Sequence, residues 1–285
     1  MMTKVGVIQM TSGPEPEHNL SFITQQLDKS RDAGIDLVLL PENALVCGKK
    51  EDYHQHAEPL GDGVVQAKLS VLAQTYQTWL VVGSMPIRRE NGVTTTTLVY
   101  SPEGRLTAHY DKLHMFDVDV ADAHARYRES ETFMPGNHVV LTETPLGKTG
   151  LSICYDLRFP HLYAELRRAG AEVILVPAAF TATTGRAHWE TLLKARAIET
   201  QCWIIAANQG GVHQDGRETW GHSMVINPWG EVVAELAEGT GMLTAILDHK
   251  ITAAVREKMP LTQQARFSSV FKNEKAKDEK ADGEK

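Results

Sequence analysis

Cysteine is scarce in this sequence of 285 residues, which contains three thiols, Cys47, Cys154 and Cys202. An odd number of widely spaced cysteines argues against a disulfide framework and favours a reducing compartment. The sequence also lacks an apolar run of the roughly 18 residues that a membrane span requires, and its start carries no signal-peptide pattern. We therefore expect a cytoplasmic protein with no membrane partner, in which each thiol needs its own explanation.

The sequence also has no excess of positive charge. The 29 lysines and arginines face 36 aspartates and glutamates, which leaves a formal net charge of −7. Such a chain has no long-range attraction to phosphate backbones, so we expect no nucleic-acid partner. The glycine-rich phosphate-binding motifs and the G-x-S-x-G motif of serine hydrolases are absent, and no full set of metal ligands occurs at a suitable spacing.

What is present is a regular alternation of short apolar runs and amphipathic segments, typical of an α/β protein. It predicts strands over 3–10, 37–40, 79–85, 149–153, 173–177, 203–208 and 241–247, and helices over 17–31, 66–76, 160–169, 188–201 and 251–257. Turn motifs at 91–92, 101–104 and 144–147 add antiparallel strands. We expect one domain over 1–270, followed by a charged tail, 271–285, that has too few apolar residues to become ordered.

The sharpest local feature is GLSICYDLRFP at 150–160, where an apolar strand runs into Cys154 and a proline then starts a helix. A thiol at that point lies at the carboxyl edge of a sheet, close to backbone N–H groups that favour a thiolate and can hold an oxyanion. The pattern therefore predicts a nucleophile. The competing interpretation is that Cys154 is a small buried apolar residue, as most free cysteines are.

Two further ionisable groups follow apolar strands, where ligands bind in open α/β sheets. Glu42 follows the strand in LLPEN, and Lys112 follows the run at 106–110 in YDKLHMF. A thiol nucleophile needs a base and an electrophilic stabiliser, and a carboxylate and an ammonium could fill these roles. Each alone is more commonly a solvated loop charge. The segment 110–136, without clear periodicity, is a candidate active-site loop and carries Glu129.

With Glu42, Lys112 and Cys154 in this order, the chain resembles the nitrilase superfamily of carbon–nitrogen hydrolases over residues 3–260. The resemblance rests on six separated segments: PEN at 41–43, YDKLHMFD at 110–117, RES at 128–130, ICYDLRFP at 153–160, HWETLLKARAIETQC at 188–202 and GHSMVINPWGEV at 221–232. These segments are most similar to the small Nit-type amidases. One departure is Arg186, where that pattern usually has proline, at a position expected beside the pocket.

The resemblance implies a four-layer α-β-β-α sandwich that forms a homodimer or higher homo-oligomer by packing into an eight-layer assembly. It also implies a catalytic set of Glu42, Lys112 and Cys154, with Glu129 positioning either Lys112 or the substrate amide. The expected reaction passes through a cysteine thioester, with the backbone N–H of Tyr155 and the Lys112 ammonium holding the oxyanion. No metal or organic cofactor is implied.

The implied substrate is a small amide with a 2-oxo acid end, deaminated glutathione in the first instance. Arg158 is the candidate clamp for the acid, because a guanidinium can bind a carboxylate through two hydrogen bonds. Phe180 and Thr184 match positions that line the acid pocket of Nit-type enzymes. Alternatively, Arg158 pairs with Asp156 and Phe180 is core. Other functions left open are an omega-amidase for 2-oxo acid monoamides, an N-carbamoyl hydrolase, and a non-catalytic scaffold.

Overall fold

The computed structural model describes residues 2–121 and 125–268; the predicted tail at 271–285 lies outside them. Two large β-sheets pack face to face. The first has the strand order β17 (Gly241–Asp248), β1 (Met2–Gln9), β2 (Leu37–Leu39), β4 (Trp79–Arg89), β5 (Gly92–Tyr100), β6 (Leu106–Asp111), with β3 (Glu58–Pro59) beside β4. The second has the order β16 (Val232–Leu236), β15 (Ser223–Ile226), β12 (Trp203–Asn208), β11 (Val173–Ala178), β10 (Gly147–Leu151), β9 (Leu141–Thr144).

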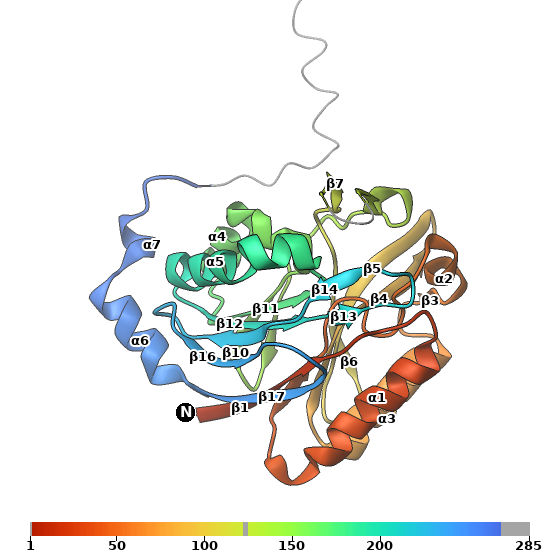
Figure 1. The fold of residues 1–285 in the computed structure, drawn as a ribbon. Helices are drawn as coiled ribbons and strands as arrows, with labels where there is room; N and C mark the ends of the chain where they lie inside the picture. Colours follow the sequence, from red (N-terminus) through yellow and green to blue (C-terminus); the bar gives the residue numbers. More distant parts are fainter. Residues whose placement is uncertain (1, 122–124, 269–285) are drawn as a thin grey trace, which may run out of the picture.

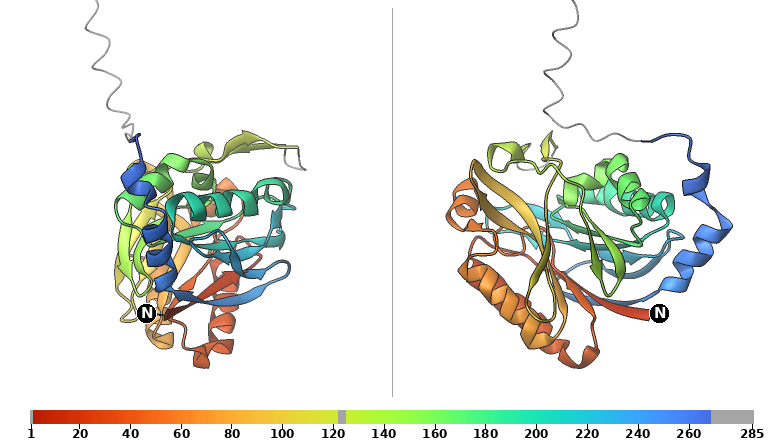
Figure 2. Two further views of the ribbon diagram at one scale, coloured as in Figure 1. Left: turned by 90° about the vertical axis from the view of Figure 1, so that its left-hand side faces the viewer. Right: turned by 180° about the vertical axis from the view of Figure 1, so that it is seen from behind.

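Helices cover the outer face of each sheet. Figure 1 shows α1 (Pro16–Lys29) and α3 (Val64–Tyr76) on one side and α4 (Pro160–Arg168) and α5 (Ala182–Thr200) on the other. The remaining helices are α2 (Lys50–Gln55), α6 (His249–Lys258) and α7 (Leu261–Gln264), with short 3-10 turns η1 (Arg31–Ala33), η2 (Glu129–Glu131) and η3 (Cys154–Arg158). This is the expected α-β-β-α sandwich, and the two turned views in Figure 2 show the same layers.

Alternation along the strands explains the layering. In β1, Val5 and Val7 belong to the buried cluster that joins the two sheets, whereas Ile8 belongs to the cluster under α1 and α3. Because successive side chains of a strand point to opposite faces, a strand with helices on one side and a second sheet on the other must be apolar on both. The continuous apolar runs in the sequence are the consequence.

Most predicted boundaries are within two residues of the observed ones, but the strand predicted over 79–85 extends to Arg89, and two further differences are informative. The helix expected from 188 begins at Ala182, with Thr181 as its N-cap accepting from the N–H of Thr184. Glycine at 185 disfavours a helix in isolation, but a Cβ there would lie 2.3 Å from Cβ of Trp220, so the close packing of that ring requires glycine. The strand expected over 149–153 ends at Leu151.

The segment 110–136 is more regular than predicted. It contains a small antiparallel pair, β7 (Asp117–Asp119) and β8 (Arg126–Arg128), followed by η2. A second small pair, β13 (Gly210–Val212) and β14 (Glu218–Trp220), forms a hairpin next to α5. All four strands have three residues, which is too short for a periodic pattern that could predict them.

Candidate active site

The structure brings Glu42, Lys112, Glu129 and Cys154 together in the wall of one cavity of about 270 Å³. Strands β2 and β4 are parallel, and β6 runs the same way because two antiparallel pairings separate it from β4. Glu42 and Lys112 therefore follow carboxyl ends at one edge of the first sheet. Cys154 follows β10, which is parallel to β11 in the second sheet. The cavity lies where strand ends of both sheets meet, in agreement with the position of ligands in open α/β sheets.

Cys154 is the first residue of η3, at the sharp turn that follows β10. Its φ of 47° lies in the left-handed region, which costs a residue other than glycine about 1–2 kcal/mol. Asp156, fully buried, holds this turn: its carboxylate accepts from the N–H of Ile153 at 2.9 Å and from the hydroxyl of Tyr110 at 2.7 Å. It also contacts Nδ1 of His114 at 2.6 Å. Asp156 thus ties the Cys154 turn to the segment around Lys112.

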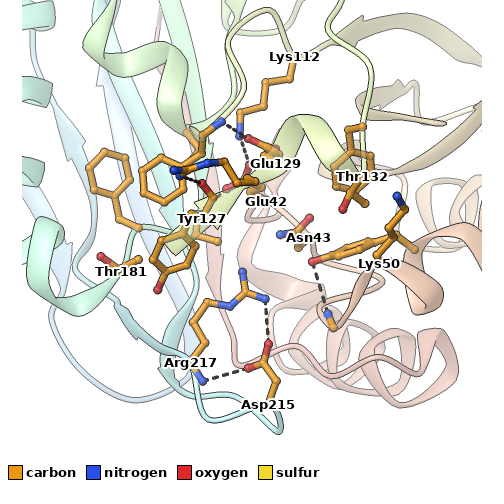
Figure 3. A pocket seen from close by; sticks show the side chains of 18 of the residues that line it. Glu42, Asn43, Lys50, Lys112, Tyr127, Glu129, Thr132, Thr181, Asp215 and Arg217 are labelled. Carbon is orange, nitrogen blue, oxygen red and sulfur yellow. Dashed lines mark hydrogen bonds and ion pairs between the residues drawn. The ribbon is translucent and has the colours of Figure 1, made fainter. Parts of the chain in front are cut away.

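Lys112 is held between two carboxylates (Figure 3). Its Nζ donates to Oε1 of Glu42 at 2.7 Å and to both oxygens of Glu129 at 2.8 Å, and its side chain is 1% exposed. Backbone groups fix the acids in turn. The N–H of Ala179 donates to Oε2 of Glu42 at 2.9 Å, and that of Phe116 donates to Oε2 of Glu129 at 2.6 Å. Charge-assisted hydrogen bonds of this length give the site a defined geometry.

The charges in this cluster control one another. Burial raises the pKa of the Cys154 thiol well above its usual value, and the negative charge of Glu42 raises it further, although Lys112 acts against both. Burial disfavours the Lys112 ammonium, but Glu129 and Glu42 outweigh it, so the pKa of Lys112 is well above its usual value. Burial likewise raises the pKa of Glu129, against the effect of Lys112. The resting site therefore holds a neutral thiol beside an ammonium.

The predicted substrate residues lie in different settings. Arg158, Phe180 and Thr184 line the cavity, whereas the Tyr155 side chain packs edge-on against Phe116 and Phe159. Arg158 does not pair with Asp156. Its guanidinium lies 3.2 Å from Nδ1 of His188 and 5.2 Å from the ring centre of Phe180.

Two expectations about single side chains need revision. Phe180 belongs to the core, because it is 4% exposed and packs on Trp189, and it also lines the cavity. Arg186 was expected beside the pocket, but it is an exposed residue of α5 whose guanidinium lies over the ring of Trp220, and it does not line the cavity.

Sequence reasoning missed several cavity residues, above all cationic ones. Lys50 begins α2, Arg126 and Arg128 lie on β8, and Arg217 lies at the tip of the β13–β14 hairpin next to Asp215. Together with Lys112 and Arg158, six cationic side chains and three acidic ones line a cavity in a chain with a net charge of −7. The paired turn residues Asp215 and Gly216 were the available signal, since they mark a hairpin tip between short strands.

Clusters of three or more histidine, cysteine, aspartate or glutamate side chains able to hold a metal ion do not occur within 2–121 and 125–268. In the same residues, no helix has the length and apolar character needed to cross a membrane. The three cysteines are free thiols, and all are buried.

The fold and the cavity define a class of enzyme. Residues 4–257 match the carbon–nitrogen hydrolase family, and the chain belongs to it. It is 46% identical over 268 residues to the deaminated glutathione amidase of Yersinia enterocolitica, and the match covers 93% of each chain.

Two solved structures have the same fold. The NitFhit protein of C. elegans is 34% identical with a TM-score of 0.85, over 93% of this chain and 65% of that one. Nit3 of Saccharomyces cerevisiae, a member of branch 10 of the nitrilase superfamily, is 29% identical with a TM-score of 0.84, over 93% and 97% of the two chains.

Proposed function

We propose that this chain is an amidase that hydrolyses deaminated glutathione to 2-oxoglutarate and Cys-Gly. The observation that carries the proposal is the Lys112 ammonium, fixed between Glu42 and Glu129 in the cavity that Cys154 lines. A relative at 46% identity has the name of that activity. Two of the lining cations, Arg126 and Arg128, pair with Glu131 and Asp119. The remaining cationic side chains, Lys50, Arg158 and Arg217 among them, favour a substrate with more than one carboxylate, and deaminated glutathione has two.

In the first half of the reaction, Glu42 accepts the thiol proton while Sγ of Cys154 attacks the amide carbon. The oxyanion that forms is stabilised by Nζ of Lys112 and the backbone N–H of Tyr155. Loss of one such donor typically costs about 3–4 kcal/mol of transition-state stabilisation. Glu42 then gives the proton to the amide nitrogen, the C–N bond breaks, and Cys-Gly leaves with a free amine. A thioester remains on Cys154.

In the second half, Glu42 takes a proton from water, which attacks the thioester carbon. The S–C bond breaks, the thiol regains its proton, and 2-oxoglutarate leaves. Glu129 acts by positioning Lys112, since both of its oxygens contact Nζ. These steps need no metal or organic cofactor. Arg158 is the proposed clamp for the carboxylate next to the 2-oxo group, with Phe180 and Thr184 as the adjacent walls.

We also propose that the protein is cytoplasmic and forms a dimer through α5. The free state of its three cysteines suits a reducing compartment. Large apolar side chains lie exposed at the proposed interface: Ile198 of α5 is 48% exposed and Trp229 of the adjoining turn is 55% exposed. The two positions are neighbours, because a Cβ on Gly230 would lie 2.7 Å from the Ile198 side chain.

The test is to incubate the purified protein with deaminated glutathione and to follow the release of 2-oxoglutarate. We expect turnover by the unaltered chain and none by Cys154→Ala, with a thioester adduct on Cys154 detectable by mass spectrometry after rapid quenching. Turnover that survives in Cys154→Ala would end the mechanism. Faster hydrolysis of 2-oxo acid monoamides or of N-carbamoyl compounds would instead assign one of the alternative activities, and no adduct with any amide would favour a scaffold.

A further inference from the structure

We propose that Arg217, assisted by Lys50, forms a second anion subsite that binds the C-terminal carboxylate of the peptide leaving group. This inference rests on the proposed function and extends it from the 2-oxo acid half of the substrate to the other half. The main evidence is the position of the Arg217 side chain, which is 17% exposed. It lies in the wall of the reaction cavity and away from the Lys112 cluster (Figure 3).

The β13–β14 hairpin holds this guanidinium in a defined place. At its base, the N–H of Trp220 donates to the carbonyl of Phe180 at 3.0 Å, and Thr219 pairs with Thr181. At its tip, the N–H of His213 donates to the carbonyl of Arg217 at 2.8 Å. The hairpin is therefore attached to the loop that carries Phe180 and Thr181, itself a wall of the cavity.

Asp215 orients the side chain without using up its hydrogen-bonding capacity. Its Oδ1 accepts the backbone N–H of Arg217 at 3.0 Å, and its Oδ2 accepts from one terminal nitrogen of the guanidinium at 3.1 Å. A guanidinium has five N–H donors in a planar arrangement, so donors remain for a carboxylate. An arginine already fixed by an acid loses less conformational entropy on binding than a free one does.

The charge balance at this end of the cavity also favours an anion. Cys47 and Tyr53 are neighbours of Arg217, but both are neutral near pH 7, because burial raises the pKa of Cys47 to about 11 and that of Tyr53 still further. Lys50, on α2 one turn before Tyr53, is an exposed cation that donates to the backbone carbonyl of Glu131 and forms no ion pair within the described residues. Asp215 therefore neutralises only part of the positive charge.

The leaving group is long enough to reach beyond the residues that contact the scissile bond. Cys-Gly spans two residues, about 7 Å when extended, between the scissile nitrogen and its terminal carboxylate. Arg158, Arg217 and Cys154 line the same cavity. Arg158 and Arg217 would thus hold the two carboxylates of one substrate, on either side of the scissile bond.

The experiment compares deaminated glutathione with its C-terminal glycine amide, which has the same scissile bond and one charge fewer. Measured as a ratio of kcat/KM, we expect the unaltered enzyme to prefer the acid. Arg217→Gln should reduce that preference by about 10-fold to 100-fold, the usual range for a hydrogen bond to a charged group, and Lys50→Met should reduce it by a smaller factor.

The ratio is insensitive to the amount of folded enzyme, so a variant that folds poorly still gives a valid result. Arg105→Gln is the matched control, because Arg105 is an exposed arginine that pairs with Glu103 and does not line the cavity. Equal rates on acid and amide in the unaltered enzyme, or a full preference retained by Arg217→Gln, would overturn the subsite. Failure to hydrolyse either compound would instead overturn the proposed function.

Discussion

A buried ammonium destabilises a folded protein unless negative charge compensates it, and Lys112 has two carboxylates within 2.8 Å. One of these acids, Glu42, also lies beside the Cys154 thiol that the mechanism uses. Removing either acid would leave the cluster with a different net charge. At the scale of single residues, the protonation state of each of Glu42, Lys112 and Cys154 therefore depends on the charges of the other two.

This coupling predicts opposite effects of Glu42→Gln on two measurements. The charge of Glu42 helps to raise the pKa of Cys154, so its removal should shift the thiol titration to lower pH and increase the thiolate fraction at any pH below that pKa. Amide turnover should nevertheless fall by a factor of about 100 or more, because the base is lost. Ultraviolet absorbance of the thiolate against pH, with Cys154→Ser subtracted, measures the first effect. A titration that moved to higher pH would contradict the assignment of Glu42 as the acid beside the thiol.

Asp156 is predicted to be as important as the reacting groups, although it touches no substrate. In Asp156→Ala, the N–H of Ile153 and the hydroxyl of Tyr110 lose their acceptor in a fully buried site. Each orphaned buried donor costs about 1–3 kcal/mol, so we expect a lower urea midpoint and reduced kcat in the fraction that folds. Asp156→Asn keeps the shape and should recover part of the stability. Unchanged stability in Asp156→Ala would show that the conformation of the Cys154 turn does not depend on the Asp156 carboxylate.

At the scale of elements, the close contact between α5 and β14 brings the hairpin to the cavity. Gly185→Ala improves helix propensity by about 1 kcal/mol, yet the added Cβ would meet Trp220 at 2.3 Å. Overpacking of this kind costs about 1–3 kcal/mol, so we expect net destabilisation in a thermal melt. Thr183→Ala, a change at an exposed position two residues away in the same helix, should be within about 0.5 kcal/mol of the unaltered chain. Greater stability in Gly185→Ala would refute the packing argument.

The β13–β14 hairpin should also respond to acid. Nδ1 of His213 lies 2.8 Å from the carbonyl of Ser12, and Nε2 lies 2.8 Å from the hydroxyl of Thr219, which fits a neutral ring that donates through Nδ1. Burial lowers the pKa of His213 below 6.5, so the unfolded chain binds a proton that the folded chain does not. The contribution of His213 to stability is therefore full above about pH 6.5 and is lost as the pH falls below it.

Urea midpoints between about pH 5 and 7.5 measure this effect, within the range where histidine titrates. As the pH falls from about 7.5 to 5, the unaltered chain should lose more stability than His213→Asn, which has no titrating ring. An equal loss in both proteins would assign the pH dependence to other groups.

At the scale of the whole molecule, the exposed pair Ile198 and Trp229 predicts self-association through the α5 layer. We expect the unaltered chain to be a dimer in analytical ultracentrifugation and Ile198→Glu to be a monomer, because the substitution would bury a charge in the proposed apolar interface. Val71→Glu is the matched control, since Val71 is 56% exposed on α3 in the opposite helical layer. A monomeric unaltered chain would remove the basis of the prediction.

The sequence also predicted much of this whole-molecule organisation. The α-β-β-α order follows from apolar periodicity and turn residues, which act within a few neighbouring positions. Helix α5 began six residues earlier than expected because its first turn depends on Trp220, which lies 35 positions beyond Gly185 in the chain. The cationic residues of β8 and of the β13–β14 tip were missed for a related reason, since a three-residue strand or the turn of a short hairpin has no periodic pattern that places its side chains.

The sequence alone determined which chemistry was available: a thiol, an ammonium and carboxylates after apolar strands, in segments that resemble one superfamily. Only the tertiary structure decided that Glu129 contacts Lys112, that Asp156 supports the Cys154 turn instead of pairing with Arg158, and that Arg217 lines the same cavity. Residue types and local order are properties of the chain, whereas distances between residues far apart in sequence depend on how two sheets and a hairpin pack. The strand ends that meet at the cavity come from both sheets, and their meeting is a result of that packing.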